Sequence, residues 1–223
     1  MSGPTRSIGE ILRLGPVVAV LTIERLADAL PLAAALRAGG IRVLEVTLRS
    51  PAALGALEQI AQRHADLIVG AGTVLRAADF QAARDAGAQF AVSPGFTPAL
   101  HEAAVAAGVA WLPAIATPSE ALVAQQAGHS FLKFYPAAIA GGVEALRAFA
   151  TVFPELAFCP TGGITAATAP DYLAAPNVAC VGGTWVAPRS AIEGQEWHKI
   201  QKLASEAAAL PRARSSAGAP GAA

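Results

Sequence analysis

Two ionisable residues lie in runs of the sequence that are otherwise apolar: Lys133 in residues 131–134 and Glu45 in residues 43–48. A neutral lysine amine can attack a carbonyl carbon, and burial favours the neutral form of an amine. Burial also raises the pKa of a carboxyl group toward neutrality, where the group can transfer protons. A structural ion pair of Glu45 with Lys133 or with Arg49 explains the same residues. A catalytic and a structural role therefore both remain open from the runs alone.

Further polar residues and glycines stand at the ends of the apolar runs. Arg49 lies two pleat periods after Glu45, so both side chains can share one face, and a guanidinium there suits bidentate capture of a carboxylate. Glycine pairs at 162–163 and 182–183 follow the last two runs, where barrel proteins commonly bind phosphate with backbone N–H groups. We therefore predict a small anionic ligand. The polar residues at these ends are Glu45, Thr47, Arg49, Thr73, Ser93, Thr117, Lys133, Thr161 and Thr184.

The elements that must position these residues are eight short apolar runs that read as buried parallel strands. They start about 20 to 26 residues apart, which is room for a strand, a helix and two loops. The sequence predicts an α/β fold with one domain, a single (β/α)₈ TIM barrel over residues 1–210, opened by a short helix at 7–14 and followed by a disordered tail at 211–223. The runs are residues 17–23, 43–48, 67–71, 90–93, 111–115, 131–134, 157–159 and 178–181.

Residues typical of helix N-termini support this assignment of alternating strands and helices. Ser50, Thr97 and Thr117 each precede a proline, which predicts a hydroxyl N-cap with proline at the first helical position. We expect the last helix over residues 193–210. A doubly wound open sheet is the alternative fold, but the first run continues directly into Glu24 without the glycine-rich fingerprint of a dinucleotide site.

The composition excludes several classes of function. The 223 residues are 54% hydrophobic and 14% charged, with sixteen basic and sixteen acidic residues. Three lysines and no basic block argue against a nucleic-acid partner. Glycine and proline interrupt the longest uncharged stretches, so we expect no membrane span and a cytoplasmic protein.

The histidines and cysteines predict neither a metal site nor a redox pair. The four histidines form no H-x-H or H-E-x-x-H pattern, and each reads as a surface or packing residue. Cys159 and Cys180 lack the spacing of a metal knuckle and read as small buried hydrophobes. We therefore expect no metal and no cofactor.

Seven sequence blocks, taken in order between residues 8 and 210, resemble the bacterial 2-keto-3-deoxy-6-phosphogluconate (KDPG) and 4-hydroxy-2-oxoglutarate (KHG) aldolases. They are GPVV (15–18), VLEVTLR (43–49), VGAGTVL (69–75), SPG (93–95), LKFYPA (132–137), FCPTGGI (158–164) and GGTW (182–185). The resemblance implies a class I aldolase that forms a Schiff base and needs no metal. It also implies a homotrimer.

The resemblance assigns roles to individual residues. Lys133 would form the Schiff base with a 2-oxo acid, and Glu45 would act as the general acid and base. Matching positions imply that substrate is bound at Arg49, Thr73, Pro94, Tyr135, Thr161, Gly162, Gly163 and Thr184. Of these, Arg49 and Thr73 match carboxylate-holding positions, while Gly162, Gly163 and Thr184 match the phosphate region. The implied products are pyruvate and glyceraldehyde 3-phosphate.

The sequence leaves other substrates and two other functions open. The segment 138–142 is less polar than is common in the resembled family, which leaves a galactonate-derived phosphate substrate and unphosphorylated 4-hydroxy-2-oxoglutarate open. A phosphate-binding barrel isomerase or synthase would use the glycine pairs without forming an imine. A barrel that senses a 2-oxo acid would bind its ligand without turnover.

Overall fold

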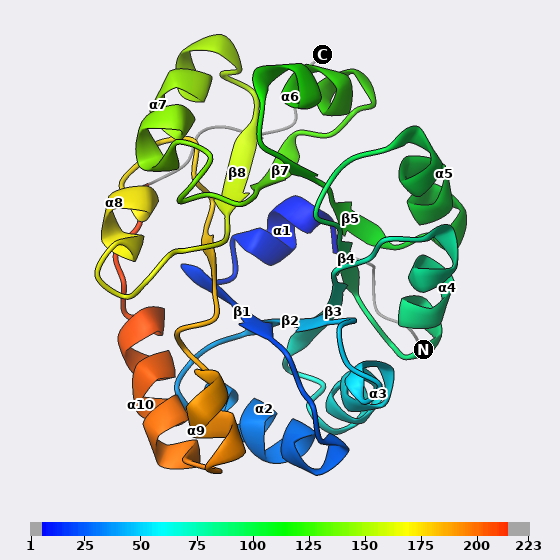
Figure 1. The fold of residues 1–223 in the computed structure, drawn as a ribbon, viewed down its shortest axis with the longest axis vertical. Helices are drawn as coiled ribbons and strands as arrows, with labels where there is room; N and C mark the ends of the chain where they lie inside the picture. Colours follow the sequence, from blue (N-terminus) through cyan, green and yellow to red (C-terminus); the bar gives the residue numbers. More distant parts are fainter. Residues whose placement is uncertain (1–5, 214–223) are drawn as a thin grey trace.

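In the computed structural model, which describes residues 6–213, parallel strands are arranged around a centre (Figure 1). The helices lie outside the strands, except the short first helix at Ile8–Leu12, which lies within the ring in this view. The chain therefore has the predicted α/β fold with parallel strands. One sheet has the strand order β5-β4-β3-β2-β1-β9, and the other has the order β6-β7-β8. The strands are β1 Val17–Leu21, β2 Val43–Thr47, β3 Ile68–Gly72, β4 Phe90–Val92, β5 Ala110–Leu112, β6 Ala114–Ile115, β7 Phe131–Phe134, β8 Ala157–Pro160 and β9 Val181–Gly183.

The strand pairing differs from the single closed sheet of eight strands that the sequence predicts. The fifth predicted strand is divided into β5 and β6 at Pro113, which has no N–H to donate to a ladder. The last predicted strand begins later than expected, at Val181, and Val178 makes an isolated bridge with Phe158. A second isolated bridge joins Thr161 to Gly182. The two sheets thus meet through bridges rather than through a full ladder.

The helices follow the strands in alternation. They are α1 Ile8–Leu12, the 3₁₀ helix η1 Leu26–Asp28, α2 Ala29–Ala38, α3 Ala53–Arg63, α4 Ala77–Asp85, α5 Pro98–Ala107, α6 Pro118–Gln126, α7 Gly142–Val152, α8 Ala169–Leu173, α9 Arg189–Glu193 and α10 Trp197–Ala208. Thr97 and Thr117 cap α5 and α6 as predicted, accepting hydrogen bonds from the N–H groups of Leu100 and Glu120.

Two details of the helix prediction are wrong. Ser50 does not cap α3, because its hydroxyl donates to the carbonyl of Ile23, 2.5 Å away, and Ala52 occupies the cap position. The helix predicted at 193–210 begins later than expected, as α10 at Trp197, because α9 ends at Glu193 and Gln195 adopts a left-handed φ of 54° between them. Both differences come from tertiary contacts and loop geometry that the cap and turn residues do not encode.

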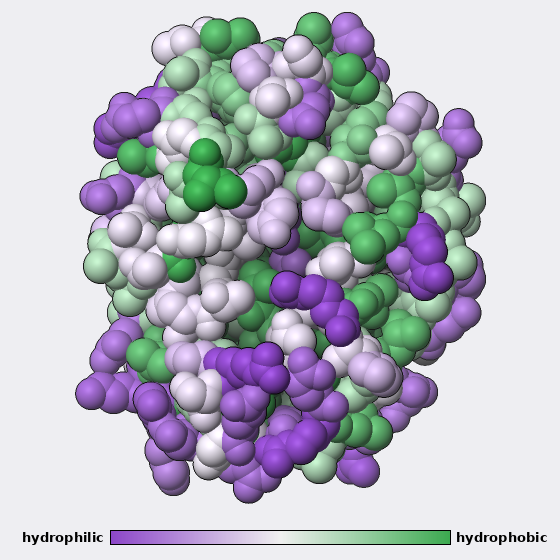
Figure 2. Space-filling model, viewed as in Figure 1, coloured by the Kyte–Doolittle hydropathy of each residue, from purple (hydrophilic) through white to green (hydrophobic). Residues whose placement is uncertain are grey.

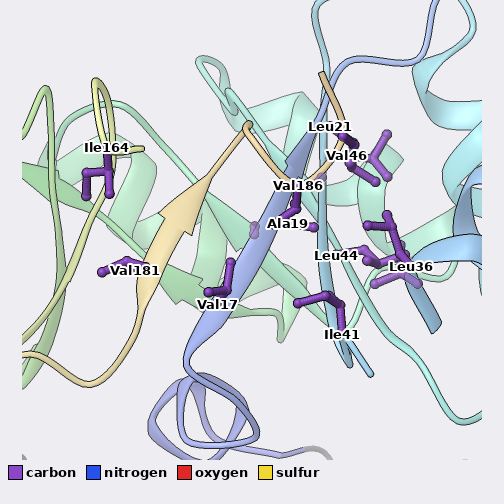
Figure 3. Close-up of a cluster of buried hydrophobic side chains, with 14 of the residues drawn as sticks. Val17, Ala19, Leu21, Leu36, Ile41, Leu44, Val46, Ile164, Val181 and Val186 are labelled. Atoms are coloured by element: carbon purple, nitrogen blue, oxygen red, sulfur yellow. The ribbon is translucent and has the colours of Figure 1, made fainter. Parts of the chain in front are cut away.

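Alternate residues of the strands build two cores. One face of the strands packs inward against α1, where Val18, Val43 and Phe90 belong to one buried cluster. The other face packs against the helix layer (Figure 3), where Val17, Ala19 and Leu21 of β1 belong to one buried cluster with Leu36 of α2. This two-sided burial explains why the strand sequences are apolar throughout rather than alternating.

Both cysteines and the end of the described chain lie by the inner core. Cys159 and Cys180 are buried free thiols, as predicted, and a hydrogen bond to Cys159 together with burial raises the pKa of the Cys180 thiol. Arg212, near the start of the predicted tail, donates to the carbonyls of Arg13, Gly15 and Ala179. Residues 214–223 of that predicted tail lie outside the described residues.

A histidine pair in the helix layer makes stability depend on pH. Nδ1 of His101 lies 3.0 Å from Nε2 of His129, and Phe96 and Trp111 pack around them. Burial, with a smaller contribution from His101, lowers the pKa of His129 from its ordinary 6.5 to about 4. The unfolded chain therefore binds a proton at higher pH than the folded chain does, so the free energy of unfolding should fall as pH drops from about 6.5 to about 4.

Urea denaturation across this pH range tests the expectation. His129→Gln should flatten the pH dependence of the free energy of unfolding, because the titrating imidazole is removed. The same substitution at the exposed His198 is the control and should leave the slope as in the parent protein. An unchanged slope in His129→Gln would assign the pH dependence to other groups.

Candidate active site

The two ionisable residues of the apolar runs meet inside the ring of strands. Nζ of Lys133, on β7, lies 3.1 Å from Oε1 and 3.3 Å from Oε2 of Glu45, on β2. The side chains are 8% and 4% exposed. Eighty-eight residues of sequence separate them, so only the fold brings the pair together. The ion pair considered from the sequence is present. Its surroundings decide whether the two residues can also take part in a reaction.

That setting is an open cavity of about 340 Å³, within the range of small-ligand sites. All ten residues to which the family resemblance assigns a role line it: Glu45, Arg49, Thr73, Pro94, Lys133, Tyr135, Thr161, Gly162, Gly163 and Thr184. Val20, Thr47, Ile164 and Gly182 complete the lining. The lysine amine and the carboxylate therefore face a space that a small molecule can enter.

Val20 and Ile164 were not selected as site residues from the sequence, whereas Gly182 belongs to one of the two glycine pairs that predicted phosphate binding. Strand alternation could have identified Val20, because Val18, two residues earlier, points into the inner core. The bridge that joins Gly182 to Thr161 is visible only in the structure.

Thr73 shows that the backbone at the cavity is constrained. It follows β3 directly and has a φ of 60°, in the left-handed region that β-branched residues rarely adopt. Such a conformation typically costs about 1–3 kcal/mol and persists where surrounding contacts impose it, often at functional sites. In this conformation Thr73 lines the cavity.

Tyr135 and two glycines form the wall beyond Lys133. The amine of Lys133 lies 5.6 Å from the centre of the Tyr135 ring. Gly162 and Gly163 have φ values of 99° and 76°, which favour glycine, and a Cβ on Gly163 would lie 2.5 Å from Cβ of Ala138. The glycines thus let two loops approach closely and leave backbone uncovered at the cavity.

Two polar strand-end residues of the sequence analysis lie outside the lining. Ser93 is buried, accepts a hydrogen bond from the Trp111 indole at 3.1 Å and donates to the carbonyl of Gly95 at 2.5 Å. It thereby supports the turn that carries Pro94 to the cavity. Thr117 caps α6 and is occupied by its hydrogen bonds with Glu120.

A second hollow adjoins the cavity and shares Val20, Arg49 and Thr184 with it. Its wall also holds Glu24 and Arg189. In Figure 2, hydrophilic residues gather over the lower part of the molecule, where α2, α9 and α10 lie. The exposed Arg49 thus stands between the buried ion pair and a polar part of the surface.

Within residues 6–213, no group of three or more His, Cys, Asp or Glu side chains is placed to hold a metal ion. None of the helices in that part of the chain has the length and apolar character needed to cross a membrane.

A buried amine touching a carboxylate at the wall of a cavity, with an arginine at its edge, suits imine chemistry on an acidic carbonyl compound. The family model described as KDPG and KHG aldolase matches residues 8–203. The chain belongs to this aldolase family. The resemblance drawn from the seven sequence blocks is therefore confirmed.

Three relatives show how close the likeness is. The KHG/KDPG aldolase of Escherichia coli K12 is 47% identical over 201 residues, covering 90% of this chain and 94% of the relative. A 2-dehydro-3-deoxy-phosphogluconate aldolase of Zymomonas mobilis is 47% identical over 208 residues, covering 93% and 98%. A crystal structure of the Legionella pneumophila KDPG aldolase, with pyruvate captured at low pH as a covalent carbinolamine, has a TM-score of 0.88 at 45% identity, covering 90% and 98%.

Proposed function

We propose that this protein is a class I aldolase, a lyase that reversibly cleaves 2-dehydro-3-deoxy-6-phosphogluconate into pyruvate and D-glyceraldehyde 3-phosphate. The observation that carries the proposal is the buried contact of 3.1 Å between Lys133 and Glu45 at the wall of an open cavity. Curated relatives of nearly full length bear this activity in their names, and one related structure holds a covalent pyruvate adduct.

The first half of the reaction forms the imine. The Lys133 ammonium gives a proton to Glu45, and the free amine attacks C2 of the substrate while the carbonyl oxygen takes up a proton. The resulting carbinolamine loses its hydroxyl as water and becomes a protonated imine. Glu45 is within hydrogen-bond distance of Nζ on both carboxylate oxygens, so it can serve each proton transfer at that atom.

The second half breaks the carbon–carbon bond. Glu45 removes the proton of the C4 hydroxyl, the C3–C4 bond breaks, and its electron pair moves to the imine nitrogen, which leaves an enamine of pyruvate. The aldehyde departs, C3 of the enamine is protonated, and water hydrolyses the imine to release pyruvate and regenerate the amine. One carboxylate can act throughout because each step returns the proton that the previous step removed.

The remaining cavity residues would hold the ends of the substrate. Arg49 and Thr73 suit the carboxylate of the pyruvyl half, because a guanidinium can bind a carboxylate through two parallel hydrogen bonds. Thr161, Tyr135 and Pro94 line the space between. Gly162, Gly163 and Thr184 would bind the distal phosphate through backbone N–H groups and a hydroxyl. Cleavage of 4-hydroxy-2-oxoglutarate to pyruvate and glyoxylate would use the same imine without the phosphate contacts.

The proposal is tested by treating the protein with pyruvate and borohydride, then measuring intact mass and mapping the modified peptide. A reduced pyruvyl adduct on Lys133 is expected. Substrate choice follows from kcat/KM for 2-dehydro-3-deoxy-6-phosphogluconate, its C4 epimer and 4-hydroxy-2-oxoglutarate, with the first expected to be highest. Absence of an adduct in the folded protein would favour the isomerase or synthase, while an adduct without turnover would favour a sensor.

Three further expectations belong with this proposal. We infer that the two sheets act as one closed barrel in which β5 and β6 count as a single strand. Hydrogen bonds from Lys133 N–H to the Pro113 carbonyl and from Ser93 N–H to the Leu112 carbonyl support this, as do the two bridges from β8 and Thr161. The homotrimer and the cytoplasmic location stay predictions from the resemblance and the composition.

A further inference from the structure

We propose that Gly72 is a positioning residue: the missing side chain at this position gives the Glu45 carboxylate its place beside Lys133. The inference rests on the proposed function, in which Glu45 transfers protons. Gly72 ends β3, next to β2, and pairs in register with Thr47, two residues after Glu45.

The space around Gly72 is filled by Glu45 itself. A Cβ built on Gly72 would lie 2.3 Å from Oε1, 2.6 Å from Cγ and 2.8 Å from Cδ of Glu45. Carbon atoms in contact normally stand about 3.5–4.0 Å apart. Rotating the carboxylate alone would not relieve this overlap, because Cγ, close to the backbone, is also involved. An added methyl group would therefore displace most of the side chain.

The displaced side chain would lose its present geometry with the amine. Glu45 is 3% exposed, and both of its carboxylate oxygens contact Nζ of Lys133. Lys133 is anchored on β7, in the other sheet, and the three atoms nearest the added methyl group all belong to Glu45. The substitution should thus move the base while leaving the nucleophile in place.

Space rather than backbone conformation is what requires glycine here. Gly72 is not among the residues with a left-handed φ, whereas the adjacent Thr73 is, at 60°. Alanine can therefore adopt the backbone of Gly72 without strain, so Gly72→Ala tests the contact with Glu45 and little else.

Gly70 offers a matched control on the same face of the same strand. A Cβ on Gly70 would lie 2.5 Å from the Phe90 ring, which is an overlap of similar size with an apolar neighbour. Gly70→Ala should therefore lower the melting temperature by disturbing the inner core. The three atoms nearest that Cβ all belong to the Phe90 ring, whereas those nearest a Cβ on Gly72 all belong to Glu45.

The experiment compares three readouts in Gly72→Ala and Gly70→Ala: kcat and KM for cleavage, deuterium exchange at C3 of pyruvate, and the pyruvyl adduct trapped by borohydride. In Gly72→Ala we expect kcat for cleavage and the exchange rate to fall about 100-fold, since a misplacement of about 1 Å can have that effect. Trapping at saturating pyruvate should persist. In folded Gly70→Ala the ratio of cleavage to trapping should stay as in the parent enzyme.

A double-mutant cycle keeps the inference testable if Gly72→Ala folds poorly. With Glu45→Ala the clashing atoms are gone, so Gly72→Ala should add no further loss of cleavage or stability to that variant. A double variant that folds when Gly72→Ala alone does not would also support the clash.

The inference is overturned if Gly72→Ala cleaves at the parent rate, or if it reduces cleavage or stability equally with and without the Glu45 side chain. A failure of the proposed function looks different. In that case Glu45→Gln itself would cleave at the parent rate, whatever residue stands at position 72.

Discussion

Lys133→Arg should lose both the pyruvyl adduct and turnover, with kcat/KM for cleavage reduced by at least about 10⁴-fold, because removing an enzyme's nucleophile can cost about 10⁶-fold. Arginine keeps a cation beside Glu45, but its guanidinium stays protonated and cannot form the imine. Borohydride trapping and steady-state cleavage assays measure the two losses separately. Lys133→Ala should be as inactive as Lys133→Arg. It should also be less stable than the parent protein, because it leaves the Glu45 carboxylate buried without its partner.

Lys199→Ala is the matched control for this experiment. Lys199 lies on α10, where it forms an ion pair with Glu196, and its side chain is 53% exposed. The control should trap pyruvate and cleave substrate like the parent enzyme. If Lys133→Arg retained turnover, the amine would have only an electrostatic role, and the isomerase or synthase would become the better assignment.

Glu45→Gln should separate imine formation from carbon–carbon cleavage. The amide has the shape of the carboxylate but cannot take up the proton of the C4 hydroxyl, so we expect kcat for cleavage and the rate of C3 proton exchange to fall about 10²–10⁴-fold. Pyruvate should still be trapped on Lys133 at saturating concentration, more slowly than in the parent enzyme. Cleavage kinetics, deuterium exchange followed by NMR and intact mass after reduction measure these three quantities.

Glu102→Gln on α5 controls for the loss of a carboxylate, since Glu102 is exposed and does not line the cavity. It should leave all three quantities unchanged. Parent-like exchange and cleavage in Glu45→Gln would mean that another group moves the protons, and the base would then have to be sought among the other cavity residues.

Much of the fold was predictable because local signals agree with the tertiary structure. Runs of buried residues mark the strands, since parallel strands covered on both faces are apolar throughout. Thr97 and Thr117 cap their helices as predicted because the bonds that a cap residue accepts come from the next three residues of its own chain. Ser50 has the same local pattern, but its hydroxyl donates a hydrogen bond to the Ile23 carbonyl of another loop instead of capping the helix.

The order of strands and helices, the identities of the amine and the carboxylate and, through the seven blocks, the family were all predictable from the amino-acid sequence. These properties depend on short segments and on residue types. The tertiary structure alone decided that Lys133 and Glu45 touch, that Pro113 divides a strand, and that Gly72 leaves room for a carboxylate. Such features depend on the register of strands far apart in the chain, and a contact of 3.1 Å follows only once packing fixes that register.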